Sequence, residues 1–178
     1  TINLGLMYGM GKNKLMAELG LLKEAAEKLI KTYNQKAPFV RMLSDAVSRR
    51  ADDSGKIRTI GGRLCHFDLW EPHGFGIKKP LPHAEALREH GPGIKRAFTY
   101  KALNKLIQGS AADMTKMAML ALYQEGVIPH VQIHDELDIS IASLEDADKI
   151  IRIMEEVVEL QVPNKVDYEE GSCWGDIH

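Results

Sequence analysis

Cysteine is scarce in this sequence, and long apolar runs and an N-terminal targeting pattern are absent. Only Cys65 and Cys173 occur among the 178 residues. They lie far apart and form no CxxC pattern, which argues against a disulfide framework or a structural zinc site and favours a reducing compartment. No run of about 18 apolar residues could span a membrane, and no basic-then-apolar signal sequence opens the chain. Hydrophobic residues at 44% and charged residues at 27% are ordinary for a globular protein with a buried core.

Charge is divided unevenly along the chain, although the formal net charge is only −2. Residues 1–100 carry 17 Lys and Arg against 10 Asp and Glu, a balance of +7, whereas residues 101–178 carry 6 against 15, a balance of −9. A basic N-terminal part and an acidic C-terminal part suit a protein that binds a polyanion through one part and cations through the other. Solvated faces of different helices explain the pattern equally well, so charge alone leaves both interpretations open.

The N-terminal half is predicted to be helical and then to change character. Apolar residues recur at helical spacing through residues 1–54, where Pro38 can open a helix. Residues 56–67 are expected to form a hairpin that turns at a Gly-Gly pair. Residues 70–94 hold four of the seven prolines and are expected to form a loop, which is the best candidate for a domain boundary.

The C-terminal half is predicted to mix helices with a hairpin. Residues 95–126 have a helical pattern interrupted near Gly109-Ser110, where Ser110 would cap a second helix. Residues 127–141 (VIPHVQIHDELDISI) alternate apolar and polar residues on both sides of an acidic turn, which indicates a β-hairpin. Ser143 is expected to cap a last long helix, and a short strand is expected at residues 165–168.

The turn of the predicted hairpin carries His134, Asp135 and Glu136. Its two carboxylates could serve Mg²⁺, which takes a few oxygen ligands from the protein and leaves room for substrate phosphates. A pair of such ions can activate an attacking oxygen and stabilise a leaving one in phosphoryl transfer. Asp and Glu also favour exposed turns for their own sake, so this triplet alone is a weak signal.

Two further sets of residues could contact nucleic acid. Asn104 and Gln108 are four residues apart, so their amides project from one helix face and could meet acceptors common to every base pair in the minor groove. Tyr8 and Gly9 stand in GLMYGMG, where an aromatic ring among glycines lets a base stack closely. A solvated polar face and a glycine-rich helix end are the structural alternatives.

The amino-acid sequences of three stretches, taken together with their order along the chain, are more specific than any one motif. TINLGLMYGMG, LNKLIQGSAADMTKMAML and VQIHDELDISI strongly resemble three consecutive stretches of family A DNA polymerases, the bacterial DNA polymerase I and bacteriophage replicase type. The resemblance runs nearly from end to end and includes the terminal CWGDIH. It implies attack of a primer 3′-hydroxyl on the α-phosphate of a deoxynucleoside triphosphate, with release of pyrophosphate.

The resemblance also implies roles for individual residues. Asp135 matches one of two catalytic aspartates that bind metal, with Glu136 as its acidic neighbour, and two Mg²⁺ ions are expected in the complete enzyme. His134 stands where the family contacts the primer terminus. Asn104 and Gln108 resemble the helix residues that touch the minor groove of the primer–template.

At the N-terminus the resemblance implies contacts with the incoming nucleotide. Tyr8 and Gly9 resemble the end of the fingers helix that closes over it, and Leu4 stands where Phe or Tyr usually faces the sugar. The Arg and Lys that bind the triphosphate, and the other catalytic aspartate, would precede Thr1. We therefore expect activity only when the chain is joined to a missing N-terminal segment; the alternative is a non-catalytic DNA-binding remnant.

The fold class expected is α+β, the C-terminal part of a polymerase right-hand fold. Residues 1–94 would form the fingers portion, with helices, a small hairpin and the loop 70–94. Residues 95–178 would form the palm portion, with an antiparallel sheet that presents the catalytic hairpin. The expected partners are primer–template DNA, deoxynucleoside triphosphates and the missing segment, with no membrane, in the cytoplasm of a bacterial or phage-infected cell.

Overall fold

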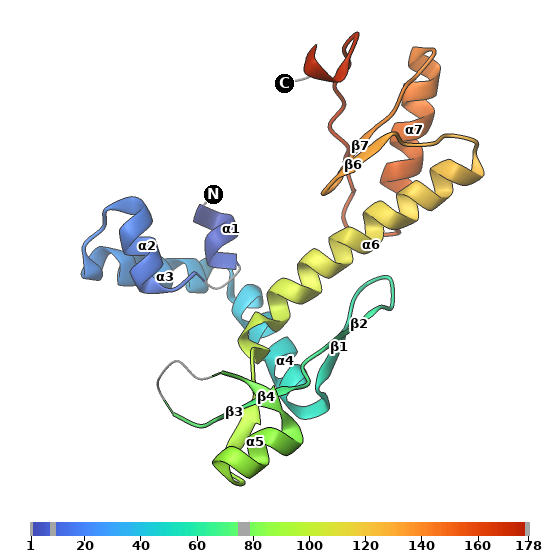
Figure 1. Cartoon of the computed structure of the whole chain (residues 1–178). Helices are drawn as coiled ribbons and strands as arrows, with labels where there is room; N and C mark the ends of the chain where they lie inside the picture. The colour runs from blue at the N-terminus through green and yellow to red at the C-terminus, as the bar shows by residue number, and fades with distance from the viewer. Residues whose placement is uncertain (1, 8–9, 75–78, 177–178) are drawn as a thin grey trace. The chain divides into compact units, whose positions relative to one another are not determined.

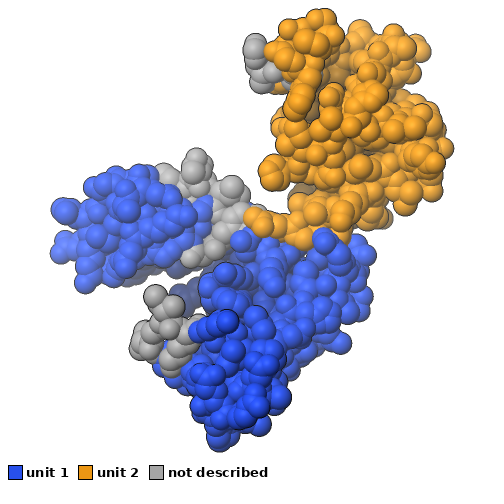
Figure 2. Space-filling model, in the orientation of Figure 1, with its two compact units in different colours: residues 1–107 blue, residues 108–178 orange. Residues whose placement is uncertain are grey.

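A computed structural model of the chain describes residues 2–7, 10–74 and 79–176 (Figure 1). It divides into two compact units, Thr1–Ile107 and Gln108–His178 (Figure 2). The division falls after Ile107, and the functional division at residue 94 stays a prediction. Helices mixed with antiparallel strands give the α+β class expected from the sequence. No helix within the described residues is long and apolar enough to cross a membrane.

The first unit begins with four helices, as predicted for residues 1–54. They are α1 (Ile2–Met7), α2 (Lys12–Leu19), α3 (Lys23–Lys36) and α4 (Pro38–Ser54). Pro38 opens α4 because its missing N–H would have no helical partner there. Leu15 and Ala26 are fully buried and form a core with Leu6. Burying a leucine side chain contributes about 1.5–3 kcal/mol, so this cluster holds the first three helices together.

The predicted hairpin at residues 56–67 is confirmed. Strands β1 (Lys56–Arg58) and β2 (Leu64–His66) pair antiparallel. Ile57 points inward between two exposed neighbours and packs with Phe67 and Ala102 in the second core of the unit. The alternation of the strand therefore anchors the hairpin to the helices on either side of it in sequence.

The prediction of a loop at residues 70–94 was wrong. This segment contributes to a three-stranded antiparallel sheet of order β4-β3-β5, with one helix between β4 and β5. The elements are β3 (Leu69–Pro72), β4 (Leu81–Pro82), α5 (His83–His90) and β5 (Ile94–Arg96). The prolines that suggested a loop stand where a sheet accepts them: Pro72 ends β3, and Pro82 lies on the edge strand β4.

Arg96 ties this sheet to the end of α4. Its Nε donates a hydrogen bond to the carbonyl oxygen of Asp52, and its Nη1 donates to that of Phe67, both at 3.0 Å. The guanidinium carbon lies 4.6 Å from the centre of a Trp70 ring, a cation–π contact. Gly55 ends α4 with a φ of +69° and stands so close that a Cβ there would meet the guanidinium at 2.7 Å.

Helix α6 (Ala102–Gln124) follows the short 3₁₀ turn η1 (Thr99–Lys101) and runs without a break. The predicted interruption near Ser110 is therefore wrong. Gly109 costs about 1 kcal/mol in a helix interior. Apolar burial on both sides of it outweighs that cost, because Leu103 and Leu122 are 5% and 0% exposed.

The second unit continues with the predicted hairpin and last helix. Strands β6 (Val131–Ile133) and β7 (Glu136–Asp138) pair antiparallel, and α7 covers Leu144–Glu156. The predicted cap is confirmed, because the Ser143 hydroxyl oxygen accepts a hydrogen bond from the backbone N–H of Asp146 at 3.2 Å. An ion pair of 2.8 Å between Lys149 and Glu125 joins α7 to the residue that follows α6.

The strand predicted at residues 165–168 does not form. Instead of a neighbouring strand, the side chain of Glu155 on α7 binds this segment. Its carboxylate accepts one from the backbone N–H of Val166 at 3.1 Å and one from the Lys165 ammonium at 2.9 Å. These bonds lower the pKa of Glu155, the Lys165 bond having the larger effect. The tail ends in the short 3₁₀ turn η2 (Trp174–Asp176).

Candidate active site

Strands β6 and β7 form a hairpin (Figure 1). Its turn consists of two residues, His134 and Asp135, and Glu136 is the first residue of β7. Cross-strand pairing places Ile133 opposite Glu136 and Gln132 opposite Leu137. Because successive side chains of a strand alternate between faces, Glu136 shares a face with Ile133 and not with Gln132. All three residues of β6 are exposed, so the acidic turn is not buried under apolar side chains.

The turn contains a backbone conformation that non-glycine residues avoid. His134 has a φ of +54°, and the left-handed region costs an L-residue roughly 1–2 kcal/mol. Both favoured two-residue hairpin turns require a positive φ at this position. Gln132 stabilises the arrangement, because its Nε2 donates a hydrogen bond of 2.8 Å to the carbonyl oxygen of His134. Such a bond contributes about 0.5–1.5 kcal/mol.

Gln132 is the residue of this hairpin that sequence reasoning missed. Gln132 lies between Val131 and Ile133, where the alternation predicts only a polar position of a strand. The signal that could have found it is its spacing of two residues from the start of the turn. At that distance a long amide side chain can reach back to the turn's own backbone.

The carboxylates of Asp135 and Glu136 are exposed, and neither has a hydrogen bond or ion pair within the part of the chain that the structure describes. No group of three or more His, Cys, Asp or Glu side chains in that part could hold a metal ion alone. Two free carboxylates without a closed cage fit Mg²⁺, which is held by one or two carboxylates together with water and substrate phosphates. The metal-binding role predicted for these residues stays a prediction.

The two predicted DNA-binding amides lie on α6, one helical turn apart. Gln108 is exposed and Asn104 half-buried. The Oδ1 atom of Asn104 is buried and has no hydrogen-bond partner among the described residues. A buried amide oxygen without a partner is costly in free energy, so this atom can accept a hydrogen bond from a further donor.

The residues predicted to contact the nucleotide are described only in part. Leu4 belongs to α1, and Tyr8 and Gly9 lie outside the described residues. Their roles stay predictions, as do those of His134, Asn104 and Gln108.

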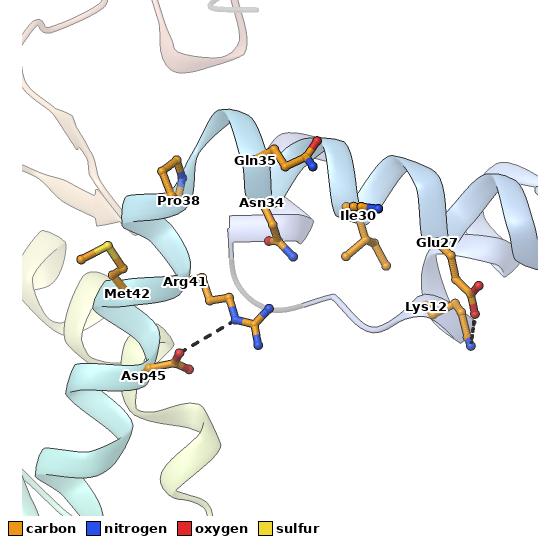
Figure 3. Close-up of a pocket in the computed structure, with 10 residues that line it drawn as sticks. Lys12, Glu27, Ile30, Asn34, Gln35, Pro38, Arg41, Met42 and Asp45 are labelled. Carbon is orange, nitrogen blue, oxygen red and sulfur yellow. Dashed lines mark hydrogen bonds and ion pairs between the residues drawn. The ribbon is translucent and has the colours of Figure 1, made fainter.

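An open pocket of the first unit is separate from these carboxylates. It is lined by residues from α2, α3 and α4, among them Lys12, Glu27 and Asn34 (Figure 3). Lys12 pairs with Glu27 at 2.7 Å and Arg41 with Asp45 at 3.9 Å across exposed surface. Because these charges are already matched and no titratable group in the pocket is buried, we assign it no chemistry.

Known proteins resemble this chain throughout its length. A DNA-directed DNA polymerase of Pseudomonas phage M6 is 31% identical over 98% of the chain and 28% of its own length. DNA polymerase I of Lactococcus lactis subsp. cremoris is 31% identical over 98% of the chain and 19% of its length. The thermostable DNA polymerase I of Thermus aquaticus is also 31% identical, over 98% of the chain and 20% of its own length. The chain thus spans between 19% and 28% of the length of these relatives.

A solved structure and a family model agree with these relatives. The polymerase domain of Pol1 from M. smegmatis, in complex with DNA primer-template and dNTP, superposes with a TM-score of 0.67. It is 25% identical and covers 91% of this chain and 27% of its own. The model of DNA polymerase family A matches residues 1–176. The chain belongs to DNA polymerase family A.

Proposed function

We propose that the chain is the C-terminal fingers and palm portion of a DNA-directed DNA polymerase. Residues 1–94 would belong to the fingers and residues 95–178 to the palm. The observation that carries the proposal is a two-residue turn that leaves the Asp135 carboxylate exposed and without a partner among the described residues, in a chain matched to family A over residues 1–176. The expected setting is the cytoplasm of a bacterial or phage-infected cell.

The reaction would join a deoxynucleotide to a primer. The primer 3′-oxygen attacks the α-phosphate of a deoxynucleoside triphosphate, the α–β phosphoanhydride bond breaks, and pyrophosphate leaves. Asp135 would be one protein ligand of two Mg²⁺ ions, and Glu136 would add negative charge beside it. Bound Mg²⁺ would stabilise the charge that develops on the attacking and leaving oxygens. The second metal-binding aspartate and the cations that hold the triphosphate would come from the preceding polymerase segment.

The chain would also contribute contacts with the primer–template and the nucleotide. Gln108 is exposed on α6, where its amide can reach a minor-groove acceptor regardless of sequence. His134 leads the turn next to Asp135 and would contact the primer terminus. Leu4, Tyr8 and Gly9 would line the nucleotide side of the fingers.

The deciding experiment is Asp135→Asn in the complete polymerase, which keeps the side-chain shape and removes the charge. Primer extension should fall roughly 10³-fold or more, because the variant lacks the carboxylate charge proposed to hold the metal ions. Each tenfold loss in rate corresponds to about 1.4 kcal/mol of lost transition-state stabilisation. Binding of primer–template, followed by fluorescence anisotropy, should remain. The matched control is Asp167→Asn, a change at an exposed acid of the C-terminal tail, which should extend normally.

Two outcomes would contradict the proposal. Undiminished extension by Asp135→Asn would remove the metal assignment. A complete polymerase that binds DNA but extends no primer would favour the alternative of a DNA-binding remnant. On this proposal the isolated chain should bind DNA without extending it, because it would supply one of the two metal-binding aspartates. For the minor-groove contact, Gln108→Ala should weaken primer–template use on all sequences alike.

A further inference from the structure

The catalytic hairpin holds a polar side chain to which the proposed reaction gives no part. Gln132 lies in β6, two residues before His134, and its Nε2 donates a hydrogen bond to the His134 carbonyl oxygen at 2.8 Å. Gln132 is exposed, and its cross-strand neighbour Leu137 has no hydrogen-bonding group in its side chain. Packing therefore does not explain a glutamine here, whereas the bond to the turn does.

The carbonyl group that accepts this bond belongs to the peptide unit shared by His134 and Asp135. The peptide unit is planar, so an anchor on its oxygen also fixes the direction of the Asp135 N–H. The Cα of Asp135 lies in the same plane, and its side chain leaves from that atom. Holding the oxygen of His134 thus restricts where the Asp135 carboxylate can point.

Such a restraint matters because strand pairing closes the turn at Ile133 and Glu136 but leaves the His134–Asp135 peptide between them. His134 adopts a φ of +54°, a conformation that persists only where the surroundings hold it and that concentrates at functional sites. The Asp135 carboxylate has no interaction with any described residue. The turn backbone is therefore what orients it, and within the described residues Gln132 supplies the side-chain bond that fixes this backbone.

We propose that Gln132 is a positioning residue, which holds the His134–Asp135 peptide so that Asp135 meets the metal in one orientation. The inference rests on the proposed function of Asp135 as a metal ligand. Mg²⁺ demands nearly ideal octahedral geometry, so a displaced carboxylate binds it poorly. Loss of residues that orient a metal ligand typically costs roughly 10- to 100-fold in metal affinity or activity.

The test compares two variants of the complete polymerase, Gln132→Ala and Gln132→Met. Methionine keeps the length of the side chain and removes its donor. Mn²⁺ binding to the polymerase–DNA complex is measured by electron paramagnetic resonance, alongside DNA affinity, melting temperature, kcat and the KM for nucleotide. In both variants Mn²⁺ affinity and kcat should fall about tenfold or more, while DNA affinity and KM stay unchanged and the melting temperature falls only by the small amount expected for one exposed hydrogen bond. Gln124→Ala, at the exposed end of α6, is the matched control and should change none of them.

Each remaining outcome overturns the inference. Unchanged Mn²⁺ affinity in both variants would mean that Gln132 does not orient the carboxylate. A parallel loss of metal affinity, DNA affinity and melting temperature would mean that it only stabilises the hairpin. Asp135→Asn in the same assay separates the two proposals. If that change abolishes Mn²⁺ binding while the Gln132 variants do not, only the positioning role fails; if Mn²⁺ binding survives it, the proposed function fails as well.

Discussion

Replacing Gly55 with alanine tests how strongly Arg96 links the β4-β3-β5 sheet of the first unit to the end of α4. Two penalties act together at this position. The φ of +69° lies in the left-handed region, which costs an alanine roughly 1–2 kcal/mol. The added Cβ would also stand 2.7 Å from the Arg96 guanidinium. That guanidinium is held by two hydrogen bonds to carbonyl oxygens and by the Trp70 ring, so it cannot move away without loss.

The size of the second penalty follows from what Arg96 must give up. A hydrogen bond to a charged group contributes about 1.5–3 kcal/mol, and a partly exposed cation–π contact about 0.5–1 kcal/mol. Partial loss of this set adds about 1–3 kcal/mol. The total for Gly55→Ala is then about 2–5 kcal/mol of unfolding free energy, the sum of the backbone and contact penalties. Urea unfolding followed by tryptophan fluorescence suits the measurement, because Trp70 is one of only two tryptophans.

Gly20→Ala is the matched control. Gly20 also ends a helix, with a φ of +62°, but nothing lies within 4 Å of the position that a Cβ would take. It should cost only the backbone penalty of roughly 1–2 kcal/mol. In an Arg96→Met background the cost of Gly55→Ala should fall to the same value. Equal losses of unfolding free energy for Gly55→Ala and Gly20→Ala in the wild-type background would refute the role of Arg96 in linking the sheet to α4.

Three further predictions concern the second unit. Ser143→Ala should lower the unfolding free energy by about 0.5–2 kcal/mol through loss of the α7 cap, while Ser143→Thr should largely retain it, as measured by urea unfolding. Leu122→Ala, at a fully buried position of α6, should cost about 2–5 kcal/mol in the same assay. Lys165→Met should raise the pKa of Glu155 toward its ordinary value of 4.5, observed by NMR titration of the carboxyl carbon. Because the folded pKa is lowered, the stabilisation is present above pH 4.5 and lost as the pH falls through the folded value; wild type and variant should converge in acid.

Sequence patterns predicted those elements of the fold whose signals are local. Helical periodicity gave α3 and α4, alternation on both sides of a turn gave β6 and β7, and the serine three residues before an acid gave the cap of α7. Predictions that depended on one residue type failed where tertiary contacts outweighed it. Gly109 did not break α6, because buried leucines on both sides stabilise the helix. Prolines did not make residues 70–94 a loop, because they occupy strand ends and a sheet edge.

The candidate site was predictable to the extent that it is a sequence motif. The position of Asp135 and Glu136 at an exposed turn follows from alternation and turn chemistry, without any coordinates. The bond from Gln132 to the His134 carbonyl does not, because it depends on the positive φ of His134 and on a side-chain rotamer. The burial of the Asn104 Oδ1 atom, which has no hydrogen-bond partner in the described part of the chain, could not be predicted either. The i, i+4 spacing gives the helix face of an amide but not the burial of its atoms.

The brevity of the acidic turn constrains how this gene can vary. Two residues join strands of three residues each, and no shorter connection is favoured in hairpins. Removing one codon between Ile133 and Glu136 would force the strands to re-pair one position out of step, and every side chain beyond the turn would change sides. Glu136 would then project on the side that Leu137 now occupies. Point substitutions in this turn can be sampled gradually during evolution, whereas a single-codon deletion would dismantle the acidic arrangement in one step.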